Sequence, residues 1–131
     1  MHRKWARAGA LSGIVFVALV VASNVSAGAI PDPSASPTKV IAFYTAHKTG
    51  QQVSATLTAA AVVVGLYFFW GLRNYLSRVS GGEQFATLGF VGALVFGVGG
   101  CINAGLQWSL AAVPTHLTPA AAQALNVLFQ R

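Results

Sequence analysis

Charged residues divide this chain into long uncharged stretches. No Asp, Glu, Lys or Arg occurs in residues 8–31, 49–72 or 84–130. A helix needs roughly 20 consecutive apolar residues, at about 1.5 Å of rise each, to cross a bilayer. The first two stretches therefore hold one spanning helix each. In the third, Pro114 and Pro119 interrupt the pattern and leave one full-length stretch and a short apolar tail.

The pattern predicts an all-α fold, a polytopic transmembrane helical bundle. Between the first two spans, Ser36 is a suitable N-cap, and Val40 and Tyr44 lie on one face of the helix that follows it, which predicts an amphipathic helix at the membrane surface with Tyr44 at headgroup depth. The expected elements of this single membrane domain, 1–131, are spans near 8–30, 53–77 and 85–112, an interfacial helix near 37–50, and a C-terminal helix of about half a span near 119–130.

The composition is typical of a membrane protein, and the placement of the charges argues against a nucleic-acid-binding protein. Of the 131 residues, 55% are hydrophobic and only 8% charged, whereas a soluble domain carries about 25% charged residues. The net charge of +6 and the pI near 10.3 raise the question of nucleic-acid binding. Most of the cations, however, stand beside the ends of apolar stretches and form no patch interleaved with aromatics. We therefore expect the lipid bilayer, and no nucleic acid, as a partner.

The positions of these cations predict the orientation. Arg3, Lys4 and Arg7 precede the first span, and Arg73 and Arg78 follow the second. Cytoplasmic loops of membrane proteins are enriched in Lys and Arg, so both groups are expected in the cytoplasm. The prediction is a multi-pass protein of the cytoplasmic (inner) membrane with a cytoplasmic N-terminus.

The first apolar stretch has a second interpretation, as a signal peptide. A basic segment ending at Arg7 precedes an apolar core, Leu11 to Val21, and Val25-Ser26-Ala27 resembles a cleavage motif. The apolar stretch 8–30 is longer than a typical signal-peptide core and long enough to span. This length favours a retained helix, and cleavage near Ala27 stays open.

Small residues recur at every fourth position of the third span. Such residues allow close approach of another helix. The expected helix-packing residues are Gly89, Ala93, Gly97, Cys101 and Gly105 in the third span, Ala61 and Gly65 in the second, and Gly9 and Gly13 in the first. We expect them to pack the bundle, and to support a homo-oligomer or a contact with another membrane protein.

Polar residues within the spans include Asn24, Asn103 and Gln107. Asn103 and Gln107 are four residues apart and share a helix face, where they are expected to bond to each other or to Asn24. A bond of this kind between helices contributes about 0.6 to 2 kcal/mol. The favoured interpretation is interhelical hydrogen bonding. The alternative is that these side chains line a path for a small solute.

The sequence contains no pattern typical of an enzyme or a cofactor site. The only acids, Asp32 and Glu83, are expected on opposite sides of the membrane, and no glycine-rich phosphate loop or nucleophile with a base is present. The three histidines lie outside the spans and far apart in the sequence. We therefore expect no catalytic residues, no metal and no cofactor. The predicted function is a non-enzymatic helix-packing or partner-binding component, and the alternative is a transporter or channel-like protein.

Several short motifs resemble those of a group of uncharacterised bacterial membrane proteins, most often actinobacterial. The matching residues are Pro31-Asp32, Ala35-Ser36, Val40, Ala42-Phe43-Tyr44, His47-Lys48, Phe68-Phe69-Trp70, Leu72-Arg73 and Leu76-Ser77-Arg78. The resemblance covers about residues 10 to 80 and brings no known activity. It implies a retained first helix. It also implies that this chain is a truncated form, because such proteins have further spans.

Overall fold

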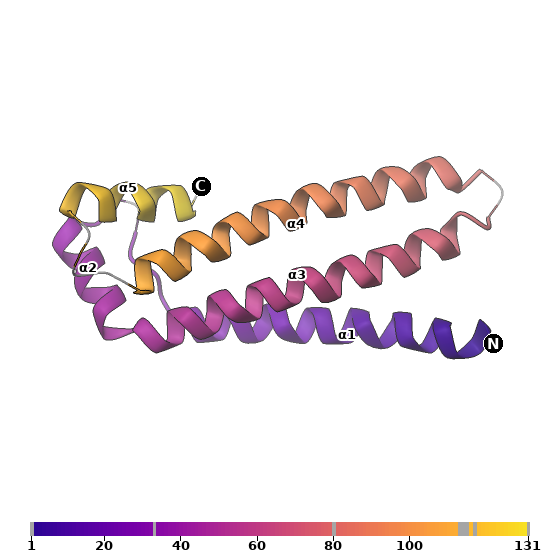
Figure 1. The fold of residues 1–131 in the computed structure, drawn as a ribbon, viewed down its shortest axis with the longest axis horizontal. Coiled ribbons are helices and arrows are strands. Elements are labelled where there is room, and N and C mark those ends of the chain that lie inside the picture. The colour runs from indigo at the N-terminus through magenta and orange to yellow at the C-terminus, as the bar shows by residue number, and fades with distance from the viewer. Residues whose placement is uncertain (1, 33, 80, 113–115, 117, 131) are drawn as a thin grey trace. The chain divides into compact units, whose positions relative to one another are not determined.

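A computed structural model describes residues 2–32, 34–79, 81–112, 116 and 118–130, and every regular element in these residues is a helix (Figure 1). The five helices are α1 His2–Ala27, α2 Pro37–Ala46, α3 Lys48–Leu76, α4 Glu83–Ala112 and α5 Pro119–Gln130. The predicted all-α fold is thus confirmed. Three segments are long and apolar enough to cross a membrane, namely Arg7–Ala27, Lys48–Leu76 and Glu83–Ala112.

Helix boundaries differ from the predicted ones at the end of α1 and at the junction between α2 and α3. α1 ends at Ala27 instead of near residue 30, because Gly28 adopts a φ of +65°, the left-handed conformation that terminates helices. The surface helix was expected to continue to about residue 50, but α2 ends at Ala46 and His47 adopts φ −110° and ψ 22°. Residues 48–52 therefore belong to α3.

Residue-level signals explain where the shorter helices begin. Ser36 is the N-cap of α2 and Pro37 its first residue, although the cap makes no side-chain hydrogen bond. At α5, the Ala121 N–H donates to Thr118 Oγ1 at 3.3 Å, as expected of a capping threonine.

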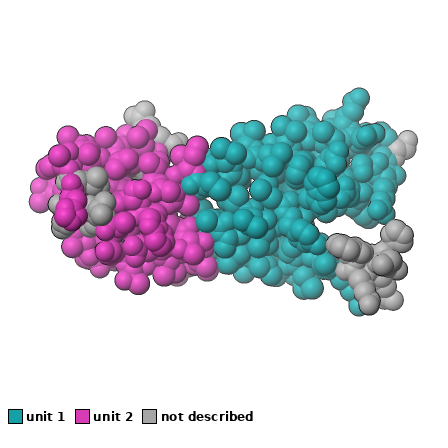
Figure 2. Space-filling view, in the orientation of Figure 1, with its two compact units in different colours: residues 1–21, 58–101 teal, residues 22–57, 102–131 magenta. Residues whose placement is uncertain are grey.

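Contacts divide the chain into two units, which are coloured separately in Figure 2. Unit 1 comprises residues 1–21 and 58–101, and unit 2 comprises residues 22–57 and 102–131. Each of the three long helices contributes residues to both units.

In unit 1, α1 and α3 each pack a phenylalanine ring against a glycine of the other helix. The ring of Phe68 in α3 lies over Gly13 of α1, so closely that a Cβ at Gly13 would be 2.8 Å from it. The ring of Phe16 in α1 lies over Gly65 of α3 at the same distance. In lipid, where the hydrophobic effect between helices is weak, such close packing provides much of the attraction.

α3 and α4 pack in unit 1 through two further glycines. A Cβ at Gly97 would lie 3.3 Å from Val62 Cγ1 and 3.6 Å from a Leu66 methyl, and a Cβ at Gly100 would lie 2.9 Å from Val62 Cγ2. These glycines accommodate the branched side chains of α3.

Unit 2 contains a small apolar core between α2, α4 and α5. Val40 and Tyr44 of α2 pack with Leu110 and Ala111 of α4, and Leu125 of α5 covers them. Tyr44 is only 1% exposed. Its ring is therefore a core side chain of unit 2, packed with Val40 as the predicted shared face of the helix requires.

The buried hydroxyl of Tyr44 predicts a stabilising substitution. Among the described residues it has no hydrogen-bond partner, and burial raises the pKa of Tyr44 to about 12, from an ordinary value of 10. Since an unpaired buried polar group costs about 1–3 kcal/mol, Tyr44→Phe is expected to raise the free energy of unfolding by about 1 kcal/mol at pH 7. Thermal unfolding in detergent measures the difference.

The same substitution has a pH signature. The unfolded tyrosine ionises near pH 10 and the folded one near 12, so the wild type should lose stability as the pH rises between these values. Tyr44→Phe should lack this part of the alkaline loss. If Tyr44→Phe is no more stable than the wild type at pH 7, the Tyr44 hydroxyl is not buried without a partner.

Candidate functional site: a buried polar cluster

A polar cluster in unit 2 joins the three long helices, and Gln51 lies at its centre. Gln51 is fully buried, at 0% exposure, and its Nε2 donates to the Ala27 carbonyl oxygen at 2.6 Å. Its Oε1 accepts from Gln107 Nε2 at 2.7 Å, and Gln107 is 2% exposed. One side chain of α3 thus holds the last carbonyl of α1 and an amide of α4.

A serine pair adds a second link between α1 and α3. The hydroxyls of Ser23 and Ser54 lie 3.1 Å apart, and Ser23 Oγ also donates to the Ser54 carbonyl oxygen at 3.1 Å. Both side chains are buried. The Gln51 cluster is defined here as Ser23, Ala27, Gln51, Ser54 and Gln107.

Only one of the three polar residues singled out from the sequence belongs to this cluster. Gln107 is in it, bonded to Gln51, while Asn103 is half-buried and Asn24 is exposed. The sequence pattern does not single out Gln51, because the predicted second span begins near residue 53. The signal that was available is helical spacing, since Gln51 and Ser54 are i and i+3 and therefore share a face.

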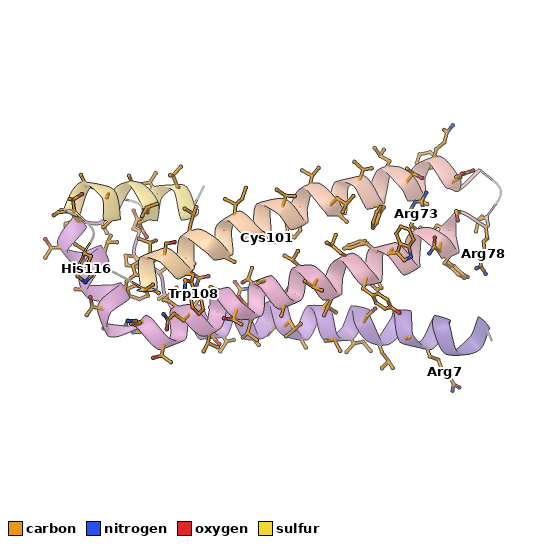
Figure 3. All side chains as sticks on the ribbon, viewed as in Figure 1. Arg7, Arg73, Arg78, Cys101, Trp108 and His116 are labelled. Carbon is orange, nitrogen blue, oxygen red and sulfur yellow. The ribbon has the colours of Figure 1, made fainter. Side chains whose placement is uncertain are left out.

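The small residues of α4 are divided between the inside of the bundle and its surface. Gly97 is buried and Ala93 half-buried, whereas Gly89, Cys101 and Gly105 are exposed (Figure 3 labels Cys101). Steps of four residues turn about 40° beyond a full circle, so such a stripe rotates out of a contact. One row of buried and half-buried positions instead alternates steps of four and three: Ala86, Phe90, Ala93, Gly97, Gly100, Ala104, Gln107 and Ala111. Near the end of α4, Asn103, Leu106, Leu110 and Ala112 are also buried or half-buried.

The predicted packing residues of the other two helices lie mostly inward. Ala61 and Gly65 of α3 are buried, and Gly13 of α1 holds Phe68. Gly9 is half-buried, with space for a Cβ beside it.

Cations and aromatic rings share one end of unit 1. Arg7, Arg73 and Arg78 lie toward the same end in Figure 3. The Arg73 guanidinium lies over the Trp70 ring, 5.8 Å from its centroid, and Trp70 meets the Phe90 ring edge-on at 5.6 Å. A tryptophan beside an arginine is typical of the boundary between lipid and water.

The carboxylate of Asp32 holds the turn that follows α1 through two hydrogen bonds. Asp32 Oδ1 accepts from the Ser34 hydroxyl at 2.5 Å and from the Ser34 N–H at 2.8 Å. These two hydrogen bonds lower the pKa of Asp32 below its ordinary value of 3.8, with a smaller contribution from Lys39.

Removing the serine hydroxyl should raise this pKa. In Ser34→Ala, Asp32 loses its strongest stabilising bond, so its carboxyl is expected to titrate at higher pH than in the wild type. Because folding lowers the pKa of Asp32, the turn is stabilised at every pH above the ordinary pKa of 3.8. It loses this stabilisation as the pH falls through the lower pKa of the folded protein. NMR titration of the carboxyl measures the shift, with Ser36→Ala as the control. Identical titration curves for wild type and Ser34→Ala would contradict it.

The chemistry of the Gln51 cluster is that of neutral amides and hydroxyls. Amides do not gain or lose protons near neutral pH, so the cluster offers hydrogen bonds and no proton transfer. Among the described residues, no three His, Cys, Asp or Glu side chains lie close enough to hold a metal ion. The arrangement fits the joining of helices.

Comparison of the chain with protein-family models, curated proteins and solved structures found no match.

Proposed function

We propose that this protein is a non-enzymatic component of the cytoplasmic membrane that packs against a second copy of itself through α4. The observation that carries the proposal is the set of small residues on α4 that the chain itself leaves open. A Cβ at Gly105 would meet nothing within 4 Å, and Cys101, four residues earlier and on the same face, is exposed. Small residues spaced by four, such as Cys101 and Gly105, allow helices in lipid to approach closely.

The Gln51 cluster supports a packing role over solute passage. Its amides are engaged with each other and with the Ala27 carbonyl, and both glutamines are almost completely buried. Bonds of this kind join the three helices within unit 2, the unit to which Gly105 belongs.

Cross-linking through the native cysteine tests the proposed contact. If two copies pack through the stripe, Cys101 of each lies near the other, and mild oxidation in membranes should give a disulfide-linked dimer. Gly105→Leu fills the open position and should reduce the dimer at least tenfold, a change of about 1.4 kcal/mol. Gly99→Leu is the matched control, because Gly99 is also open but lies about 160° around the helix from Cys101.

The outcomes separate three possibilities. A dimer that Gly105→Leu removes and Gly99→Leu leaves supports the proposal. If Gly105→Leu and Gly99→Leu reduce the dimer equally, or if neither reduces it, the contact lies elsewhere. A cross-linked species of another mass, with no dimer, means that the stripe packs against a different membrane protein.

The proposed orientation has the N-terminus in the cytoplasm. The support for it is the end of unit 1 that carries Arg7, Arg73 and Arg78, since positive residues are retained on the cytoplasmic side. Single cysteines at positions 34, 80 and 131, in a Cys101→Ala background, report the sides. Position 34 should label in intact cells and position 80 only after permeabilisation. Labelling at 80 in intact cells would contradict the orientation.

A further inference from the structure

The cleavage motif at the end of α1 acquires a different meaning in the folded chain. Val25 and Ala27 are the third and first residues before the Ala27–Gly28 bond, and small residues at these positions are typical of signal-peptide cleavage sites. In the proposed orientation, on which this inference rests, the bond lies on the outer side of the membrane, where such a peptidase acts.

The helical conformation of α1 keeps the two recognised side chains apart. In an extended chain, residues two apart point to the same side and enter neighbouring pockets together, whereas in a helix they point about 160° apart. α1 stays helical through Ala27. Val25 is accordingly 77% exposed, while Ala27 is 8% exposed and faces the bundle.

α3 covers the bond itself. The carbonyl that a peptidase would attack is that of Ala27, and it accepts the 2.6 Å hydrogen bond from Gln51. One residue earlier, the Ser26 carbonyl oxygen lies so close to α3 that a Cβ at Gly50 would be 2.9 Å from it. Cleavage of the folded chain therefore needs α1 to leave α3 and unwind over its last turn.

We propose that Ala27–Gly28 is a latent cleavage site for a membrane signal peptidase, which the packing of α1 on α3 masks, with Gln51 holding the scissile carbonyl. Cleavage adds water across the bond, leaving a carboxylate on Ala27 and an amine on Gly28. The fold thus decides between the two interpretations of the first apolar stretch. A chain that packs α1 retains it, and a chain that does not pack it becomes a substrate.

Pulse-labelled cells carrying a C-terminally tagged full chain provide the test, because products are counted before any later degradation. The wild type should stay full-length. Gln51→Ala removes the bond to the scissile carbonyl and should increase the open population about tenfold, so that a fragment beginning at Gly28 appears. Gly50→Ala, which pushes α3 away from Ser26, should give the same fragment by an independent route. Gln52→Ala, a half-buried neighbour outside the cluster, should stay intact.

A second substitution identifies the bond. Val25→Phe places a bulky group where a small one is required, at a side chain exposed from the bundle. Combined with Gln51→Ala, it should abolish the fragment without restoring the packing.

The outcomes either support the masking or overturn it. Cleavage of the wild type at Ala27–Gly28 overturns it, and so do intact chains for both Gln51→Ala and Gly50→Ala. Labelling of a cysteine at position 34 in the same cells separates this result from a failure of the proposed orientation. If position 34 labels from outside and both variants stay intact, only the masking is wrong. If it labels only after permeabilisation, the orientation is wrong and the masking falls with it.

Discussion

Gly97→Leu is expected to destabilise the bundle by about 2 kcal/mol relative to the same substitution at Gly99. A Cβ at Gly97 already lies 3.3 Å from Val62 Cγ1, and leucine adds three further carbons toward Val62 and Leu66. Overpacking of this kind costs about 1–3 kcal/mol. At Gly99 an added Cβ meets nothing within 4 Å. Both changes remove a helix glycine, so the helix propensity of leucine cancels in the comparison.

Unfolding by detergent titration or steric trapping measures this difference, and a rescue identifies its cause. Val62→Ala removes the two methyl groups that leucine at position 97 meets, so it should restore part of the stability of Gly97→Leu. In the wild-type background the same change should only destabilise, because it leaves a gap beside Gly97 and Gly100. If Val62→Ala destabilises both backgrounds equally, α3 and α4 do not meet at Gly97.

The second large effect is expected in the Gln51 cluster. Gln51→Leu removes bonds to both Ala27 and Gln107 and should cost about 2–3 kcal/mol, since it leaves two buried polar groups without this partner. Gln107→Leu removes one bond and should cost about 1–2 kcal/mol. The double variant should cost less than the two single changes together, by about 0.6–2 kcal/mol, because the bond between the glutamines is lost only once.

The same unfolding measurements decide this prediction. Gln52→Leu is the control for leucine at this depth, since Gln52 adjoins Gln51 but is half-buried and outside the cluster. Exact additivity of Gln51→Leu and Gln107→Leu would mean that the two amides do not interact in the membrane-embedded protein.

The sequence alone determined the number and place of the long helices. Charged side chains are costly in lipid, so the uncharged stretches bounded by residues such as Arg7 and Glu83 mark the helices that are long and apolar enough to span. It also identified Ser36 as the start of a helix, because the preference for serine before a first helical residue is local. The sequence predicted the ends of the helices less accurately. The exact end of α1 depends on the conformation of Gly28, and the break between α2 and α3 at His47 has no Pro or Gly to announce it.

Tertiary structure decided which of the similar residues form the contacts. Gly89, Gly97 and Gly105 are equivalent in the sequence pattern, yet only Gly97 is buried, because a four-residue repeat rotates away from a neighbouring helix that is met every three and a half residues on average. Likewise, Gln51 and Gln107 are 56 residues apart, and nothing local pairs them. Their bond exists because α3 and α4 place the two amides opposite each other, where each replaces the water that the other has lost.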